Sequence, residues 1–594
     1  MKRIIKLYIH ILLFSCLMVS CESYLDKAPE VEITEKQVFG SFNTFQGFIE
    51  QMCNCVTDML KNSTYYQADE CLDVYPFAFD SGNYWDGSGF LTGGPGIDVR
   101  SNDYEARRIW EWGWYGIAIA NLALQKIDEP DLFEGTQEQY NLLKGQALFF
   151  RGFFYFQICR FWGGMPYITR VLESDELFGS DEFARLNFKE TAIKMAADFR
   201  AAADILPDHW DRTPSGQLTL GHNRDRINKF FGLGFLGLTY LWGASPMINE
   251  EATGVNAFDP VMCAQAADAF GELLRLRDNT QLYAMAPFDR YLEIFYRHGN
   301  YRPGLDEVIM SPTPVPRDYW MPARFLPSDL GLSFSNCVGV THNYTKNFGC
   351  KEGFPIDDDL SVYNENDPWE NRDPRFYKVI VYDNVQMHSI EKAGTETVSQ
   401  LYNGGYHRAV RSPFNVTGYY TFKFSGLNTS IVTDAIISTV RSYIPYLRLA
   451  DVYLMYAEAV NFQTGGGPKA TSSNYSMTAE DAINMVRNRA ELPDIHAKFT
   501  ANSQLFFEEI IRERAVELCF EWQRFSDLRR WNRNGDPRYL QKTVIRFDRD
   551  ANQKPVNLVE EVMVTRVAEK RHNWVPIPTS YTVMYKNFPQ NPGW

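Results

Sequence analysis

The 594-residue sequence predicts an all-α fold, in which a tetratricopeptide-like helical repeat scaffold carries a long loop-rich insertion with minor β-strands. Two blocks of the chain show helical periodicity, and a proline-rich segment separates them. In addition, a small residue followed three positions later by tyrosine recurs in the helical blocks, as in paired helices of repeat proteins. Apolar residues make up 45% and charged residues 22% of the chain, which excludes a disordered or collagenous protein.

The predicted organisation has four parts. Residues 1–20 are a signal peptide, and residues 21–280 form an N-terminal helical scaffold with a binding loop at 75–103. Residues 281–446 are the loop-rich insertion and the expected ligand-binding region, and residues 447–594 supply helices and a tail that complete the scaffold. The chain is long enough to bury a large core, because single cores stop growing at about 250–300 residues.

The N-terminus predicts export and a lipid anchor. Lys2, Arg3 and Lys6 precede an apolar segment, Leu7–Met18, that is too short to span a bilayer. Small residues then lead to Cys21, as in a bacterial lipobox, whose cysteine becomes the lipidated first residue. The alternative is an ordinary signal peptide with a chance cysteine.

The first helical block begins after the predicted binding loop, and the second follows the insertion. The periodicity predicts helices at Tyr104–Ile127, Gln137–Phe161, Phe188–Leu206, Ile227–Gly243, Val261–Leu276, Arg448–Phe462, Ala479–Leu492 and Leu505–Trp531. Trp110, Trp112 and Trp114 fall inside the first of these helices, and we expect them to pack in the core.

The repeat pattern occurs at Gly152/Tyr155, Gly237/Tyr240 and Ala450/Tyr453. The motif around Gly237 fits the first helix of a tetratricopeptide unit, and Ala266-x-x-x-Phe270 fits the second. The spacing between the three pairs is irregular, so the pattern predicts a degenerate repeat that insertions interrupt.

An uncharged stretch, Phe230–Asn249, is either a transmembrane helix or a helix buried on all sides. The acidic composition of the whole chain, and the fact that this stretch is the lone candidate span, favour burial.

The insertion differs in composition from the helical blocks. Twelve of the 29 prolines fall in residues 281–446, which are also rich in Tyr, Asn, Asp and Gly. Short alternating runs at Tyr377–Tyr382 and Tyr419–Phe424 predict small strands. A second loop-rich stretch covers Tyr75–Asp103. Long structured loops on a rigid scaffold are where binding residues usually lie.

Net charge and cysteine usage exclude two classes of protein. The formal net charge is −15, and such an acidic chain repels phosphate backbones, so nucleic acid is not expected as a partner. Ten cysteines in 594 residues do not make a disulfide scaffold. Cys159, Cys263 and Cys519 lie in helical patterns and are expected to be buried, whereas Cys337 and Cys350 could form a bridge.

No local motif for catalysis, metal or cofactor binding occurs in the sequence. The nine histidines form no HExxH or HxH pair, and no G-x-S-x-G, GxxxxGK or GxGxxG motif is present. We therefore predict no catalytic residue, metal or cofactor. A glycosidase pair of carboxylates stays open, because its two acids can be distant in the chain.

An acidic stripe marks the last predicted helix. Glu509, Glu513, Glu517 and Glu521 repeat at every fourth position. Like charges at this spacing destabilise a helix unless they are matched. Nearby arginines predict a structural ion-pair network, with Glu517 and Arg524 as a buried pair; these arginines are Arg512, Arg514, Arg524, Arg529 and Arg530.

The same helix resembles the signature of the SusD/RagB family, and further segments agree with that family in order along the chain. The segments are Cys21–Pro29, Gly145–Arg151 with Phe161–Pro166, Arg448–Ala459, Phe507–Glu521 with Arg524–Trp531, and Val575–Pro578 with Gln590–Trp594. The resemblance implies a lipid-anchored, cell-surface, outer-membrane protein with four tetratricopeptide-like units and no catalytic activity. It further implies capture of a glycan, or less often a peptide, and a partner in a SusC-like TonB-dependent transporter.

The family signature does not include binding residues, so the site must be predicted from chemistry. Sugars present flat apolar faces rimmed with hydroxyls, which aromatic rings and short polar side chains bind together. Two loop clusters have this composition: Asn83, Tyr84, Trp85 and Asp86 in the first, and Arg317, Tyr319 and Trp320 in the second. The alternative is that each ring anchors its own loop to the scaffold.

The leading functional hypothesis is therefore a lipoprotein that captures an oligosaccharide and delivers it to a transporter. Two alternatives stay open: the same fold binding peptides, and a secreted carbohydrate-active enzyme with an all-helical fold.

Overall fold

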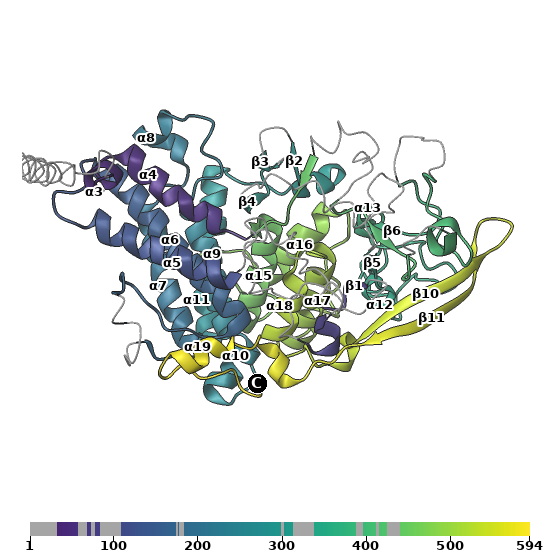
Figure 1. The fold of residues 1–594 in the computed structure, drawn as a ribbon. Helices are drawn as coiled ribbons and strands as arrows, with labels where there is room; N and C mark the ends of the chain where they lie inside the picture. The colour runs from purple at the N-terminus through teal and green to yellow at the C-terminus, as the bar shows by residue number, and fades with distance from the viewer. Residues whose placement is uncertain are drawn as a thin grey trace, which may run out of the picture.

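Helices form the left and centre of the molecule in Figure 1, and loops with short strands and one long hairpin form most of its right-hand part. The computed structural model describes residues 33–57, 68–72, 78–83, 109–173, 176, 183–298, 302–303, 305–312, 338–387, 396–410, 415–424 and 440–594. The helices before the insertion are α3 (Glu35–Phe39), α4 (Phe42–Glu50), α5 (Ile109–Ile127), α6 (Gln137–Trp162), α7 (Phe188–Ile205), α8 (Pro214–Gln217), α9 (Lys229–Ala244), α10 (Pro246–Thr253) and α11 (Pro260–Thr280).

The N-terminal helices pack in chain order, with α5 on α6, α6 on α7, α7 on α9 and α9 on α11. Thr136 and Asn187 begin α6 and α7 with capping boxes, which satisfy backbone donors at the first turn. The predicted boundaries of these helices are confirmed to within a few residues, and residues 104–108 of the first lie outside the described residues.

Glycines set the close approach of these helices, as the repeat pattern predicts. A Cβ atom on Gly237 of α9 would lie 2.6 Å from the ring of Phe270 on α11, and one on Gly152 of α6 would lie 3.0 Å from Phe199 of α7. The predicted pairing of the Gly237 motif with the Phe270 motif is therefore present as a helix contact.

The uncharged stretch Phe230–Asn249 is buried, as expected. It forms α9 and the start of α10, and almost every residue of α9 is in the core. Among the described residues no single helix meets the length and hydropathy expected of a membrane span, although α9 and α10 together do, with a bend of 55° between them.

The helices inside and after the insertion are α12 (His342–Thr345), α13 (Pro374–Val379), α15 (Leu449–Phe462), α16 (Ala479–Arg489), α17 (Ser503–Glu517), α18 (Gln523–Arg530) and α19 (Thr579–Met584). The prediction of one helix over Leu505–Trp531 is wrong. The chain breaks between α17 and α18, where Phe520 and Trp522 adopt left-handed backbone angles. The Glu70 carboxylate accepts the Phe520 N–H (2.7 Å), which holds the break in place.

The strands are short, except for the last two. They are β1 (Cys71–Leu72), β2 (Tyr296–His298), β3 (Arg302–Pro303), β4 (Val308–Met310), β5 (Gly339–Val340), β6 (Ile380–Val381), β7 (Tyr420–Thr421), β8 (Val440–Ser442), β9 (Leu447–Arg448), β10 (Gln541–Arg549) and β11 (Pro555–Thr565). The pairs β1–β5, β2–β3, β2–β8, β4–β9, β6–β7 and β10–β11 are all antiparallel.

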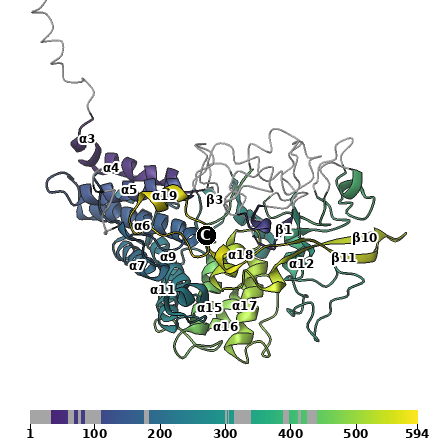
Figure 2. The ribbon, with the colours of Figure 1, turned by 60° about the horizontal axis from the view of Figure 1, so that its bottom comes forward.

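The two predicted strands of the insertion exist in shortened form and pair with each other, Ile380 opposite Thr421. The first is preceded by α13, which takes up the start of the predicted strand because Asp373 caps a helix there. The β10–β11 hairpin was not predicted: it lies in the C-terminal block and extends away from the helices in both ribbon views (Figures 1 and 2).

Cysteines and tryptophans largely follow the prediction. Cys159, Cys263 and Cys519 are completely buried, and burial raises the pKa of the Cys519 thiol to about 12. Cys350 carries a free buried thiol, and Cys337, its possible partner, lies outside the described residues. Trp110 is buried, whereas Trp112 and Trp114 are half-buried at the edge of the core.

Candidate functional site

Of the predicted binding residues, the structure describes Asn83, which is half-buried. Tyr84, Trp85, Asp86, Arg317, Tyr319 and Trp320 lie outside the described residues, and so does the predicted lipidation site Cys21.

The structure brings together the bases of the two chain segments that carry these clusters. Cys71 and Leu72 of β1 precede the first segment, and Gly339 and Val340 of β5 follow the second. The two strands pair, with Cys71 opposite Val340 and Leu72 opposite Gly339. One small sheet therefore joins the start of the first segment to the end of the second, although the two strands are more than 260 residues apart in sequence.

The base of the first segment is also attached to the C-terminal part of the chain. Asp80 forms an ion pair with Lys542 (2.9 Å), and its carbonyl oxygen accepts the Val567 N–H (2.7 Å). A Cβ atom on Gly82 would lie 3.1 Å from Val567 and 3.2 Å from the His572 ring. Asn83 follows directly, so the chain that leads into Tyr84 starts from a fixed position.

Two acids before β1 extend this attachment. Asp69 pairs with Arg524 of α18 (3.0 Å), and Glu70 accepts the Phe520 N–H. Burial raises the pKa of Glu70 to about 8, against the opposing effect of the Phe520 N–H and of Arg524. Thr341, next to β5, donates its hydroxyl to the Asp69 carbonyl (2.5 Å) and its N–H to the Glu70 carbonyl (3.0 Å).

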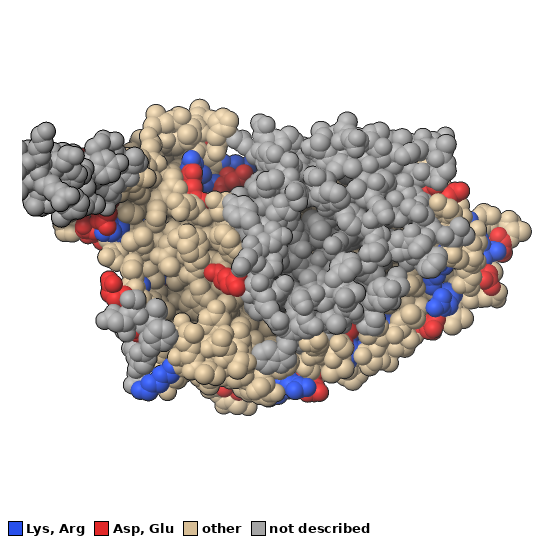
Figure 3. Space-filling view, viewed as in Figure 1, with Lys and Arg blue, Asp and Glu red and all other residues tan. Residues whose placement is uncertain are grey.

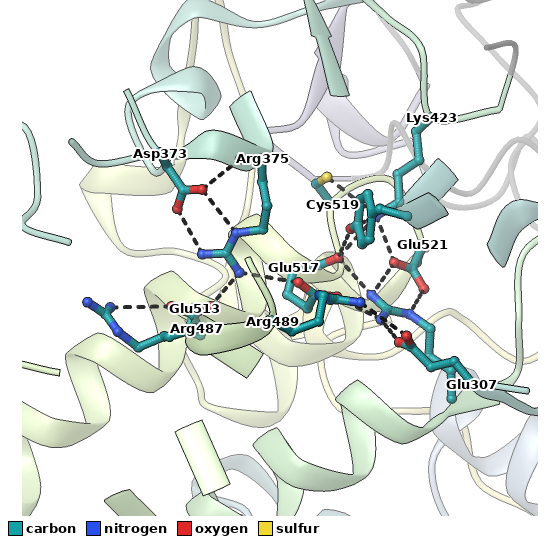
Figure 4. A network of polar contacts seen from close by, with 12 residues as sticks. Glu307, Asp373, Arg375, Lys423, Arg487, Arg489, Glu513, Glu517, Cys519 and Glu521 are labelled. Atoms are coloured by element: carbon teal, nitrogen blue, oxygen red, sulfur yellow. Dashed lines mark hydrogen bonds and ion pairs between the residues drawn. The ribbon is translucent and has the colours of Figure 1, made fainter. Parts of the chain in front are cut away.

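The acidic stripe of α17 enters a buried ion network (Figure 4). Glu517 pairs with Arg448 (2.7 Å), Arg375 (3.2 Å) and Arg489. Burial alone would raise the pKa of Glu517, but the three guanidinium groups outweigh it and hold that pKa well below its usual range.

The network contains five acids and five bases. They are Glu307, Asp373, Glu513, Glu517, Glu521, Arg375, Lys423, Arg448, Arg487 and Arg489. Glu307, Asp373, Arg375 and Lys423 come from the insertion, so the network attaches the insertion to α15, α16 and α17. This matched set has a structural role, because each charge is neutralised within the core.

The predicted network is thus confirmed, but its predicted pairing is wrong. Arg524 pairs with Asp69 and not with Glu517. Arg512 pairs with Glu509 of the stripe, as predicted, whereas Arg514 and Arg530 pair with Asp527 of α18. The partners of Glu517 come from elsewhere in the chain, which local sequence spacing cannot indicate.

Two of the cavities among the described residues have volumes in the range of ligand sites, about 300–1,000 Å³. The larger, about 840 Å³, lies between α12, α17 and the β10–β11 hairpin. Six of its charged side chains are paired with one another: Lys346 with Glu560 (2.6 Å), Arg512 with Glu509, and Arg538 with Glu508 (3.3 Å). Asp357 and Glu365 also line it. Such a cavity offers few charges for a ligand. No group of three or more His, Cys, Asp or Glu among the described residues could hold a metal ion.

The smaller cavity, about 340 Å³, is a cleft lined by aromatic rings between the start of α5 and the C-terminal segment. Its lining residues are Trp110, Glu111, Trp114, Pro166, Ile168, Leu172, Phe183, Tyr581, Tyr585 and Phe588. We refer to it as the aromatic cleft. Sequence reasoning missed it because Trp110 and Trp114 were interpreted as packing residues and the C-terminal rings are more than 460 residues away.

On the face shown in Figure 3, acidic and basic side chains are interspersed over the described surface without a patch of one sign.

The comparisons with known proteins agree with this architecture. A family model described as "SusD family" matches residues 313–594, and a second, "Starch-binding associating with outer membrane", matches residues 23–219. The chain belongs to the SusD/RagB family. It is 25% identical to SusD-like protein P2 of Formosa agariphila over 425 residues, which is 70% of each chain.

Solved SusD-like structures share the fold. A SusD-like protein from Bacteroides fragilis is 19% identical to this chain and has a TM-score of 0.69. The match covers 96% of this chain and 100% of that chain. A SusD-like carbohydrate binding protein from the same species is also 19% identical, with a TM-score of 0.65 and coverage of 92% and 99%. At the level of the family, carbohydrate binding and association with the outer membrane follow from these matches.

Proposed function

We propose that this SusD/RagB protein is a cell-surface lipoprotein without catalytic activity that captures a neutral oligosaccharide. It passes this glycan to a SusC-like TonB-dependent transporter in the outer membrane. Support comes from the two family models and from the carbohydrate-binding protein of the same fold.

The binding site is proposed to lie on the two loop clusters. Tyr84, Trp85, Tyr319 and Trp320 would stack on sugar faces, and Asn83, Asp86 and Arg317 would bind hydroxyls. The β1–β5 pairing is the observation that carries this proposal, because it joins the start of the first loop-bearing segment to the end of the second in one sheet. Attachment of that sheet through Asp69 and Asp80 makes it a rigid base for a binding site.

Calorimetry with a panel of neutral hexasaccharides, built from glucose, mannose, galactose or xylose, tests the function. We expect one or more of them to bind, with little dependence on salt because a neutral glycan offers no charge to screen. Trp85→Ala and Trp320→Ala should each weaken binding by about 2 kcal/mol or more, as expected for a ring at the centre of an interface.

Three results would contradict the proposal. Wild-type affinity in both variants, with unchanged melting temperature, would mean that these rings only anchor their loops. Turnover of a hexasaccharide that a single carboxylate substitution abolishes would indicate an enzyme. Binding of peptides in place of every sugar would reassign the ligand class.

The anchor is a separate prediction. Cys21→Ala should leave the protein folded but release it from membranes, because the acyl chains contribute about 0.8 kcal/mol per buried methylene. Membrane fractionation after a high-salt wash measures this. A variant that stays with the membrane fraction would refute lipidation at Cys21.

A further inference from the structure

The aromatic cleft contains an unbroken series of ring contacts. Trp114 contacts Trp110 (ring centroids 5.9 Å apart), and Trp110 contacts Tyr581 (5.4 Å). The rings of Tyr581 and Tyr585 are nearly parallel, 6° apart with centroids at 6.3 Å, and Tyr585 contacts Phe588 (6.1 Å). These rings give the cleft a largely apolar wall with the flat surfaces that sugar rings favour.

Trp110, one of the residues that line the cleft, has a buried donor. Trp110 is 2% exposed, and its indole Nε1–H has no hydrogen-bond acceptor in the part of the chain that the structure describes. A buried donor without a partner costs about 1–3 kcal/mol. A ligand hydroxyl in the cleft would supply the missing acceptor. The Glu111 carboxylate also lines the cleft and offers an acceptor for hydroxyl donors.

One wall of the cleft is held by buried side chains behind it. Ile168 donates its N–H to the Tyr155 hydroxyl (2.7 Å), and its carbonyl accepts from the Asn121 amide (3.1 Å). Tyr155 also stacks on Tyr167, with centroids 4.1 Å apart. The segment that includes Pro166 and Ile168 is therefore fixed before any ligand arrives.

The opposite wall, formed by the C-terminal segment, is fixed as well. Gln590 bonds both the N–H and the carbonyl of Ile577 (2.8 and 2.7 Å). The Asn591 amide donates to the carbonyls of Trp162 (3.1 Å) and Val575 (2.7 Å). Arg185 donates its backbone N–H to the Asn587 carbonyl (3.0 Å). Both walls are thus preorganised, which lowers the entropy that binding would cost.

We propose that the aromatic cleft is a second carbohydrate site, which holds a short neutral part of a glycan against Trp114, Tyr581 and Tyr585, with a hydroxyl accepting from the Trp110 indole. Its volume lies at the lower end of the range of about 300–1,000 Å³ for ligand sites, which fits a short segment and not a long chain. The inference rests on the proposed glycan specificity of the protein, but not on the loop residues proposed for the first site.

Fluorine NMR of protein labelled with 5-fluorotryptophan tests this directly. The Trp110 and Trp114 signals are assigned as those missing from Trp110→Phe and Trp114→Phe. Titration with a hexasaccharide that the wild-type protein binds should shift both signals. They should still shift in the Trp85→Ala/Trp320→Ala double variant, because the cleft does not contain those residues.

Calorimetry on cleft variants gives a second measurement. Trp114→Ala and Tyr585→Ala should each weaken hexasaccharide binding at the cleft about tenfold, the effect of losing one stacked ring. Tyr115→Ala is the matched control: Tyr115 lies on the same helix, is 53% exposed and does not line the cleft. The Tyr115→Ala variant should bind the hexasaccharide with the affinity of the wild type.

The outcomes separate the two proposals. Unmoved Trp110 and Trp114 signals and unchanged affinity in the cleft variants, while the wild type binds a hexasaccharide, would overturn the second site alone. Shifted cleft signals together with wild-type affinity in the loop variants would support the cleft and overturn the loop site. A wild-type protein that binds no hexasaccharide of the panel would overturn both.

Discussion

The two halves of the helical scaffold bury different chemistry. In the N-terminal half, α6, α7 and α9 meet through aromatic rings: Phe235 contacts Phe153 (5.3 Å), Phe149 (5.5 Å) and Phe199 (5.8 Å). In the C-terminal half, α17 places carboxylates and guanidinium groups in the core, with Glu517 completely buried.

The difference indicates what each half depends on. Apolar packing depends on volume and shape, so it holds neighbouring helices at fixed distances. A buried charge is destabilising unless opposite charges neutralise it, so each one needs its partners, wherever these lie in the chain. In this protein several of the partners, including Glu307, Arg375 and Lys423, belong to the insertion. Packing thus builds the scaffold, and ion pairs attach the predicted binding region to it.

The largest expected effect comes from removing the centre of the network. Glu517→Ala should destabilise the protein by about 3–5 kcal/mol, because Arg375, Arg448 and Arg489 lose a shared buried partner. Urea unfolding measures this. Hexasaccharide affinity of the folded fraction should be unchanged, since the role is structural.

Glu561→Ala provides the matched control for a carboxylate. Glu561 pairs with Arg546 on the β10–β11 hairpin, where both side chains are over 40% exposed. Exposed pairs contribute about 0–1 kcal/mol. Equal losses of unfolding free energy in the two variants would contradict the distinction between buried and exposed charges. Lower hexasaccharide affinity of Glu517→Ala with unchanged stability would place Glu517 in a binding site.

A second effect depends on pH. Because burial raises the pKa of Glu70 to about 8, the folded state keeps this proton at pH values where the unfolded chain has released it. Its contribution to stability is therefore complete below about pH 4.5 and is lost as pH rises towards 8. The Glu70→Gln variant can still accept the Phe520 N–H but does not ionise.

Between pH 5 and pH 8 the wild type should lose about 2–4 kcal/mol of unfolding free energy relative to Glu70→Gln. Urea titrations at pH 5, 6.5 and 8 give the difference. If the free energy of unfolding changes with pH in the same way in the two proteins, Glu70 is ionised in the folded state. The attachment of β1 to Phe520 would then be an ordinary charged contact.

The N-terminal half could be predicted closely from the sequence, because its signals are local. Caps such as Thr136 and Asn187, apolar periodicity and the small residues at Gly152 and Gly237 each act within one helix or one helix pair. The periodicity predicted the helix boundaries, and the small residues predicted one helix pairing.

The C-terminal half and the site could be predicted only in part. The acidic stripe correctly indicated buried ion pairs, but the partners of Glu517 lie at positions that no spacing rule connects to it. The break in the last helix depends on Glu70, which is about 450 residues away. For the same reason the sequence could not join Trp110 to Tyr581 in one cleft.

The smallest expected effect tests the apolar half. Gly237→Ala should cost about 1–3 kcal/mol, because the added methyl would lie 2.6 Å from the Phe270 ring and one of the two helices must move. Gly47→Ala is the matched control: Gly47 also lies within a helix, α4, and a Cβ atom there would meet nothing within 4 Å. The Gly47→Ala change should stabilise the protein by up to about 1 kcal/mol through helix propensity. Thermal unfolding measures the stability of both variants. A Gly237→Ala variant as stable as Gly47→Ala would mean that the α9–α11 contact is not closely packed.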